Sequence, residues 1–484
     1  MLRSTKDSHQ RSIPAMRDSC RSFFEVIERV STVVSHRCEP FVALMSTIVG
    51  TAFVLAAYIG VASCCNNHAS SVESESEDAL ISQGVAEPGV REGRCVPIGI
   101  DEYVGPKSVG DIDELLPFAT EIGNGVSYEG GFAAGALRQE GGGTSFAIVM
   151  ANREASEWKT VSAGVSHGEA QAPRVFARGD TLAAAFLVPQ GVSRVLRLAR
   201  VFHDGIRWGA EFPQGYDESL AFDAAIGPSI GIVVWDDVLN GRKNSSVVVG
   251  TFDPVTLTKP SKPVVVSPNG TDAETPMVVE RDGGFWLFWL ARRSSSDSGS
   301  DAREARYAAE GIDYRWIEAM PLDQYGRAAG SPTKISPSDG HVLGYDVVSL
   351  GDGSAMVVWR DDDTPSGSDG GVIYSAVVQL GGVTGPEQIE NEQASAGGPI
   401  AMPGWLAVVN TQSVNANGGT YLAPMSVAGR PTDELAREYV LGAGEPIAVR
   451  DNDLLVSRPS GTAARLQVFR CRRDAIDAGT VESE

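Results

Sequence analysis

The sequence is poor in the residues and motifs that carry metal and nucleophile chemistry. Its 484 residues include only six cysteines and six histidines, and three of those histidines follow residue 95: His167, His203 and His341. No two of the three lie at metal-ligand spacing, and no CxxC or HExxH motif occurs. No GxSxG nucleophile elbow, phosphate-binding loop or dinucleotide fingerprint stands out either. We therefore nominate no catalytic residue from the sequence.

Basic charge is also scarce. The chain has 40 lysines and arginines against 62 acidic residues, which gives a formal net charge of −22. Such a surface repels phosphate backbones, so nucleic-acid binding is excluded as a function class. Glycine and proline are abundant, with 54 and 26 residues, and this favours many turns and short strands over long helices.

One long apolar run stands near the N-terminus. Residues 41–62 read FVALMSTIVGTAFVLAAYIGVA and contain no charge. As a helix the run would be roughly 33 Å long, enough to span a bilayer. Basic residues precede it and an acidic tract follows it, so residues 1–40 are expected to be a cytoplasmic or signal region and 41–63 the apolar signal or membrane segment.

The apolar run ends in VASC, Val61 to Cys64. This resembles the lipobox of bacterial lipoproteins, in which an aliphatic residue and two small residues precede a cysteine that is lipidated and becomes the new N-terminus. The resemblance implies that Cys64 carries the lipid, with Cys65 as its neighbour. The region before the run is long for a signal peptide, and translation starting at Met16 would shorten it. The alternative is an uncleaved signal anchor, and either way most of the chain lies outside the cytoplasm.

A polar linker follows. Residues 64–94 are rich in serine and glutamate and poor in aromatics. Such a segment buries too little apolar surface to offset the entropy of ordering it, so we expect a flexible tether.

From residue 95 to residue 484 a pattern recurs: a short strand, a turn with Asp or Gly, and a strongly apolar strand that often ends in Trp. Copies begin near residues 128, 173, 228, 276, 345, 399 and 446, and most are separated by about 45–55 residues. Where alternation is visible, as in VLRLARVF from Val195 to Phe202, its period is two. The sequence therefore predicts an all-β fold.

Units of this length with several short strands are typical of propeller blades, whose faces are buried against neighbouring blades. We predict a seven-bladed β-propeller over residues 95–484, with Trp235, Trp289 and Trp359 packed between blades. A pair of β-sandwich domains is the alternative fold, but it does not require seven similar starts in a row. With its lipobox and repeat, the chain resembles the propeller-type surface lipoproteins of Gram-negative bacteria.

Closing such a ring has an entropic cost. Two cysteines lie within the predicted propeller, Cys95 at its beginning and Cys471 near its end. We predict that they form a disulfide, which an exported location permits, and that the strand at Cys95 completes the last blade. Two unrelated thiols are the alternative.

The candidate ligand site is acidic. Asp236 and Asp237 follow Trp235, and three further aspartates, Asp361, Asp362 and Asp363, follow the stretch that ends in Trp359. If the copies superpose, these carboxylates project from one face of the ring, where they could coordinate Ca²⁺; no other cofactor is expected. Arg292 and Arg293 take the equivalent place in another copy, and solvated strand ends are the alternative reading.

Three function classes stay open. A membrane-anchored cell-envelope propeller most simply binds an unidentified protein, peptide or glycan through loops on one face. A glycan hydrolase of the sialidase type is the second: SSDSG from Ser295 resembles half of the sialidase Asp box, but Ser300, Asp301 and Ala302 replace the aromatic that should follow. A structural envelope role is the third. Converging carboxylates in the channel would favour the hydrolase, and an exposed apolar rim would favour the binder.

Overall fold

The computed structural model describes residues 95–471 with gaps; the gaps are residues 105–119, 141–142, 167–169, 191–192, 214–220, 240–243, 294–314, 339, 362–370, 395–398, 411–418, 426–443 and 461–462. The predicted signal or anchor segment, Cys64 and the linker lie outside the described residues. Within the described part no helix has the length and apolarity needed to cross a bilayer.

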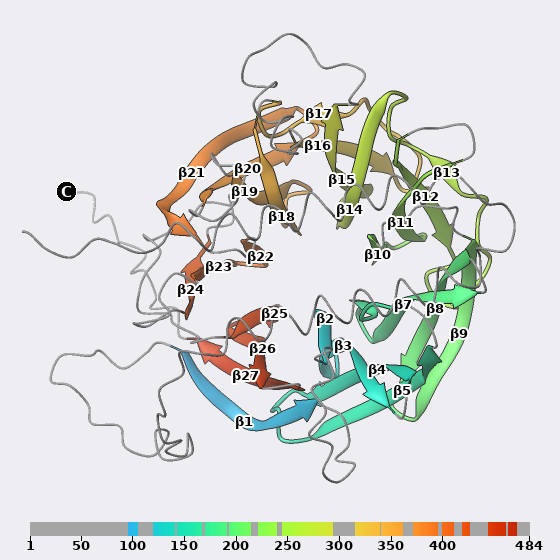
Figure 1. Ribbon diagram of the computed structural model, residues 1–484, viewed down its shortest axis with the longest axis vertical. Helices are drawn as coiled ribbons and strands as arrows, with labels where there is room; N and C mark the ends of the chain where they lie inside the picture. The colour runs from blue at the N-terminus through green and yellow to red at the C-terminus, as the bar shows by residue number, and fades with distance from the viewer. Residues whose placement is uncertain are drawn as a thin grey trace, which may run out of the picture. The chain divides into compact units, whose positions relative to one another are not determined.

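Seven separate antiparallel sheets follow one another around a ring (Figure 1), and each is one blade. The first three blades each have four strands in sequence order, counted from the channel outward. Blade 1 contains β2 (Glu121–Tyr128), β3 (Gly131–Glu140), β4 (Gly143–Asn152) and β5 (Trp158–Ser166). Blade 2 contains β6 (Arg174–Arg178), β7 (Thr181–Gln190), β8 (Ser193–Phe202) and β9 (Gly205–Pro213). Blade 3 contains β10 (Phe222–Ile226), β11 (Gly231–Asp237), β12 (Ser246–Phe252) and β13 (Val264–Val265).

Blades 4 and 5 repeat this order, and blade 6 has three described strands. Blade 4 contains β14 (Thr271–Arg281), β15 (Gly284–Arg293), β16 (Arg315–Asp323) and β17 (Thr333–Lys334). Blade 5 contains β18 (Val342–Ser349), β19 (Ala355–Asp361), β20 (Gly371–Gln379) and β21 (Gly382–Ala394). Blade 6 contains β22 (Ile400–Met402), β23 (Trp405–Asn410) and β24 (Gly419–Pro424).

Blade 7 closes the ring by combining the two ends of the described chain. Its strands are β25 (Glu445–Arg450), β26 (Asp453–Ser460), β27 (Ala463–Cys471) and, outermost, β1 (Cys95–Val104). Strand β1 pairs antiparallel with β27 in a register that places Cys95 opposite Cys471, and these two cysteines form a disulfide. The seven-bladed fold, the completing strand and the disulfide are therefore confirmed. The sandwich alternative is wrong, because the sheets follow one another around the ring and do not stack in two pairs.

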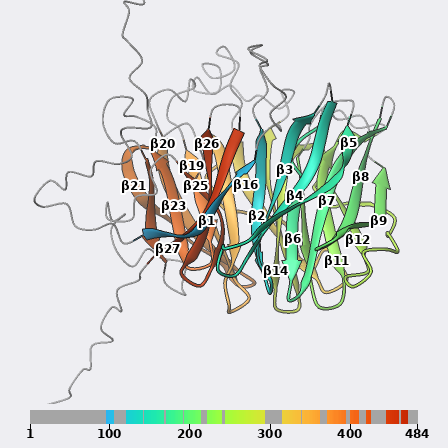
Figure 2. The same ribbon diagram turned by 90° about the horizontal axis from the view of Figure 1, so that it is seen from below.

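The core is divided among the junctions between blades. Each of the seven junctions holds one hydrophobic cluster with side chains from the two sheets that meet there. Second strands such as β11 are buried along their whole length, because both of their faces are covered by neighbouring blades. Figure 2 shows the sheets edge-on, packed face to face.

The predicted tryptophans occupy these junctions. Trp235, Trp289 and Trp359 are each at most 1 % exposed, and each belongs to a cluster that spans its own blade and the preceding one. Their role as packing residues between blades is confirmed. Blade 1 differs from the expected position in one respect: its innermost strand begins at Glu121, earlier than the start near residue 128.

Candidate functional site

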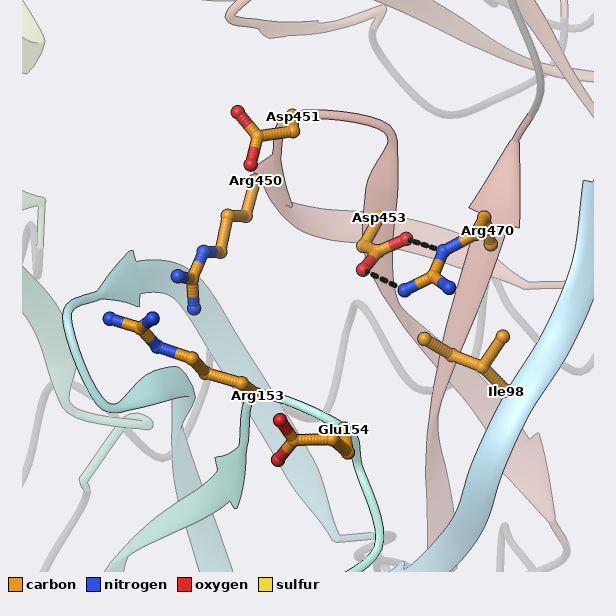
Figure 3. Close-up of a pocket in the computed structure, with 7 residues that line it drawn as sticks. All are labelled: Ile98, Arg153, Glu154, Arg450, Asp451, Asp453 and Arg470. Carbon is orange, nitrogen blue, oxygen red and sulfur yellow. Dashed lines mark hydrogen bonds and ion pairs between the residues drawn. The ribbon is translucent and has the colours of Figure 1, made fainter.

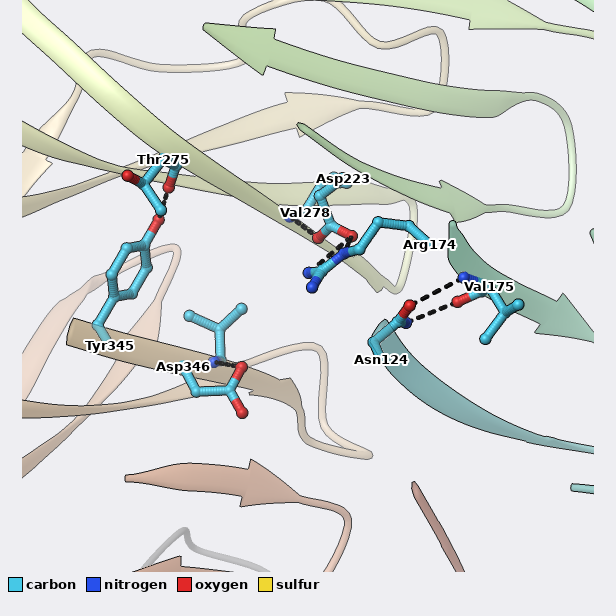
Figure 4. A network of polar contacts seen from close by, with 9 residues as sticks. Asn124, Arg174, Val175, Asp223, Thr275, Val278, Tyr345 and Asp346 are labelled. Atoms are coloured by element: carbon cyan, nitrogen blue, oxygen red, sulfur yellow. Dashed lines mark hydrogen bonds and ion pairs between the residues drawn. The ribbon is translucent and has the colours of Figure 1, made fainter. Parts of the chain in front are cut away.

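Polar side chains from four innermost strands converge on the channel of the ring. Asn124 lies on β2, Arg174 on β6, Asp223 on β10 and Asp346 on β18 (Figure 4), and each of the four is partly exposed. We call these four residues the channel cluster. Arg174, Asp223 and Asp346 are flanked along their strands by apolar residues of the junction clusters, so alternation directs these three polar side chains to the channel. Asn124 lies between two glycines.

Asn124 links blade 1 to blade 2. Its side-chain nitrogen Nδ2 donates to the carbonyl oxygen of Val175 at 2.7 Å, and its Oδ1 accepts from the Val175 backbone N–H at 2.8 Å. An asparagine side chain thus imitates one rung of a β-ladder between two innermost strands that belong to different sheets.

Arg174 and Asp223 form an ion pair across the next junction. Nε and Nη2 of Arg174 lie 3.3 and 3.2 Å from Oδ1 of Asp223, and the side chains are 31 % and 14 % exposed. The other oxygen of Asp223, Oδ2, accepts from the backbone N–H of Val278 in blade 4 at 2.9 Å. Nη1 of Arg174 makes no hydrogen bond to any residue in the described part of the chain, which leaves donor capacity directed at the channel.

Asp346 is the carboxyl of the channel cluster whose pKa is raised. Its Oδ1 accepts from the Val347 N–H, and its Oδ2 accepts from the N–H of Ala401 in blade 6, both at 2.9 Å. Burial raises the pKa of Asp346 to about 6, because desolvation and the charge of Asp223 outweigh the two backbone donors and Arg174. A carboxyl of this kind exchanges a proton near neutral pH.

A strained bulge stands beside the cluster. The pairing of β14 with β15 shifts between Glu274 and Met277, and Thr275 has a φ of 52°, which is unusual for a β-branched residue. Its N–H donates to Oδ2 of Asp236 at 2.8 Å, and its carbonyl accepts from the Tyr345 hydroxyl at 2.5 Å. Three successive blades therefore hold this backbone in place, and burial raises the pKa of Tyr345, so its hydroxyl stays a donor.

The acidic residues nominated from the sequence are partly described. Asp236 and Asp237 end β11 and are buried, at 3 % exposure each, so they are not solvated strand ends. Asp361 accepts from the His341 N–H at 2.7 Å through Oδ1. Asp362 and Asp363 lie outside the described residues. Among the described residues no group of three or more His, Cys, Asp or Glu is placed to hold a metal ion, and the calcium hypothesis stays untested for the full set.

None of the four residues of the channel cluster was predicted from the sequence. A signal exists for three of its members, because Arg174, Asp223 and Asp346 are polar residues within otherwise apolar innermost strands, as in RVFA at Arg174 and DVVS at Asp346. The fold also explains a GxSxG match in the sequence. Residues 227–231 read GPSIG and match GxSxG, but they join antiparallel β10 and β11, not a strand and a helix, so they form no nucleophile elbow.

No protein-family model and no curated protein sequence matches this chain. Among solved structures it is similar to the β-propeller domain of the trilobed protease from Pyrococcus furiosus, with 10 % identity, a TM-score of 0.44, and coverage of 73 % of this chain and 96 % of that one. It is also similar to the polysaccharide lyase Uly1, with 10 % identity, a TM-score of 0.46 and coverage of 78 % and 100 %. A third is an α-L-arabinofuranosidase from Fusarium graminearum, with 11 % identity, a TM-score of 0.42 and coverage of 78 % and 98 %. These similarities concern the β-propeller fold alone.

Proposed function

We propose that the protein binds a glycan in the channel, over Arg174, Asp223 and Asp346. The observation that supports this is the convergence of one guanidinium and two carboxyl groups, from three blades, on partly exposed positions of the channel wall. Sugar hydroxyls both donate and accept, so they match a wall that offers Nη1 of Arg174 beside carboxyl oxygens.

Hydrolysis of the bound glycan is the second candidate function. It is favoured by the pKa of about 6 at Asp346 beside the ion-paired carboxylate of Asp223. Glycoside hydrolysis uses one carboxyl that holds a proton for the leaving oxygen and a second that stays ionised. In this mechanism Asp346 donates the proton, and Asp223, which is paired with Arg174, acts as base or nucleophile.

Calorimetric titration of the full-length protein in detergent with a panel of neutral and acidic oligosaccharides tests the binding proposal. We expect at least one oligosaccharide to bind, with affinity reduced ten-fold or more in Arg174→Gln. Arg465→Gln is the matched control, because Arg465 is an exposed arginine on β27 that pairs with Asp101 at 3.6 Å. If Arg174→Gln binds as tightly as wild type while remaining folded, the channel proposal is wrong.

Release of new reducing ends separates the two candidates. If the protein is a hydrolase, Asp346→Asn retains binding and loses cleavage, because the amide has no proton to give. If wild type binds but releases no reducing ends from any bound oligosaccharide, the protein is a binder only.

We further propose that the propeller is exported and anchored in the cell envelope through Cys64. Support comes from the VASC sequence at the end of the apolar run and from the Cys95–Cys471 disulfide, which fits an oxidising compartment. Metabolic labelling with an acyl-chain probe is expected to mark wild type and not Cys64→Ala. Equal labelling of the two would favour the uncleaved anchor.

A further inference from the structure

A pocket separate from the channel cluster lies at the junction where the ring closes, between blade 7 and blade 1. It has a volume of about 330 Å³ and is lined by Ile98, Arg153, Glu154, Arg450, Asp451, Asp453 and Arg470 (Figure 3). Arg450 ends the innermost strand of its blade, whereas Arg174 of the channel cluster begins one. Innermost strands of successive blades run in the same direction, so Arg450 and Arg174 lie toward opposite faces of the ring.

The pocket contains one complete ion pair, between Arg470 and Asp453. Nε and Nη2 of Arg470 donate to the two oxygens of Asp453 at 2.7 and 2.8 Å, which is a bidentate pair. This pair fixes one wall of the pocket and neutralises its own charge.

The two other arginines face each other from different blades. Arg153 follows β4 in blade 1, and its Nε donates to the Glu129 carbonyl at 2.7 Å, which orients the rest of the guanidinium. The Arg450 side chain makes no hydrogen bond or ion pair with any residue that the structure describes. Figure 3 shows the two guanidinium groups pointing toward one another, with the carboxylates of Asp451 and Glu154 directed elsewhere.

Ring closure sets the distance between these arginines. The N–H of Ile100 on β1 donates to the Ala155 carbonyl at 2.9 Å, and the Trp158 indole donates to the Ile100 carbonyl at 2.8 Å. Strand β1 therefore belongs to blade 7 but is also hydrogen-bonded to the β4–β5 turn of blade 1. The backbone segments that carry Arg153 and Arg450 are therefore fixed next to each other on the two sides of the closing junction.

We propose that this pocket binds an oxyanion, a sulfate, phosphate or carboxylate group, between Arg153 and Arg450. Planar guanidinium groups recognise these anions with paired, charge-assisted hydrogen bonds. An anion bound to both guanidinium groups ties blade 7 to blade 1. It therefore stabilises the closed ring by mass action, independently of any ligand in the channel.

Thermal unfolding of the full-length protein in detergent tests the proposal. Sodium sulfate, sodium phosphate and sodium glucuronate are each titrated from 0 to about 20 mM, with sodium chloride holding the ionic strength constant. We expect at least one of these anions to raise the melting temperature saturably by about 1–2 °C. Sulfate or phosphate acting alone identifies an inorganic anion, and glucuronate acting alone identifies the acid group of a sugar.

Arg450→Gln and Arg153→Gln are each expected to abolish the saturable rise, whereas the control Arg465→Gln keeps it. If one of the two variants does not fold, the other decides. The proposal is overturned if none of the three anions gives a saturable rise, or if the rise persists in the folded pocket variants. Because the sulfate arm contains no sugar, its result does not depend on whether the channel binds a glycan.

Discussion

The carboxyl of Asp346 has a pKa of about 6, well above its ordinary value of 3.8. The folded protein therefore holds this proton more tightly than the unfolded chain does. The stability that Asp346 contributes is fully present below pH 3.8 and is lost as pH rises through about 6, by up to about 3 kcal/mol.

The matching prediction concerns Asp346→Asn, which cannot ionise. Relative to wild type, its unfolding free energy is expected to improve by up to about 3 kcal/mol between pH 4 and pH 7, because only the wild type has to ionise a carboxyl whose pKa is raised in the fold. The amide faces one backbone N–H with its own NH₂, and this adds a cost that does not change with pH. Urea unfolding of both proteins at pH 4, 5, 6 and 7 measures the difference. A difference that stays constant with pH would contradict the raised pKa.

Two tryptophans in different positions show how much burial at a blade junction contributes to stability. Trp359 on β19 is fully buried and stacks on Tyr374 of β20, with ring centroids 5.6 Å apart. Trp208 on β9 is 37 % exposed and contacts Arg197 and Phe186 at the outer part of its blade. The two residues have the same side chain in very different surroundings.

Trp359→Ala is expected to lower the unfolding free energy by about 3–5 kcal/mol, because it opens a cavity at a blade junction. Trp208→Ala is expected to cost no more than about 2 kcal/mol, since its ring is already partly in water. Denaturant unfolding followed by circular dichroism gives both values. Equal losses in the two variants would argue against packing between blades as the main source of stability.

At the scale of strands and blades, the innermost strands show which features of the fold could be predicted from the sequence and which could not. The apolar second strands, the turns and the tryptophans repeat, so seven blades and their packing were predictable from local pattern. The channel cluster was not, because its contacts join residues about 50 positions apart, as Arg174 and Asp223 do. The strand ends after Trp235 and Trp359 do carry polar side chains, Asp236 and Asp361. Their carboxylates accept hydrogen bonds from the backbone N–H groups of Thr275 and His341. Local sequence identifies polar residues, but only the arrangement of the ring decides which of them meet.

At the scale of the whole propeller, the ring is closed by joining the first and last described strands, β1 and β27. The Cys95–Cys471 disulfide connects residues separated by 376 positions, and the N-terminal strand β1 is held in the blade of the last strands. In the chain-entropy model a cross-link over such a loop stabilises the fold by up to about 6 kcal/mol, and measured values are often smaller.

We expect Cys95→Ser combined with Cys471→Ser to lower the unfolding free energy by several kcal/mol, within that limit of about 6 kcal/mol. Wild-type protein in reducing buffer should unfold at the same denaturant concentration as the double variant in the absence of reductant. A double variant as stable as oxidised wild type would show that pairing of β1 with β27 closes the ring without covalent help.

The position of that cross-link also decides how the propeller responds to tension. Cys95 is the first residue of β1 and lies opposite the last residue of β27. A mechanical load arriving through the preceding residues therefore reaches the sulfur–sulfur bond before it reaches the hydrogen bonds of the strand. The force passes directly into β27 of blade 7, so β1 is not peeled away one hydrogen bond at a time.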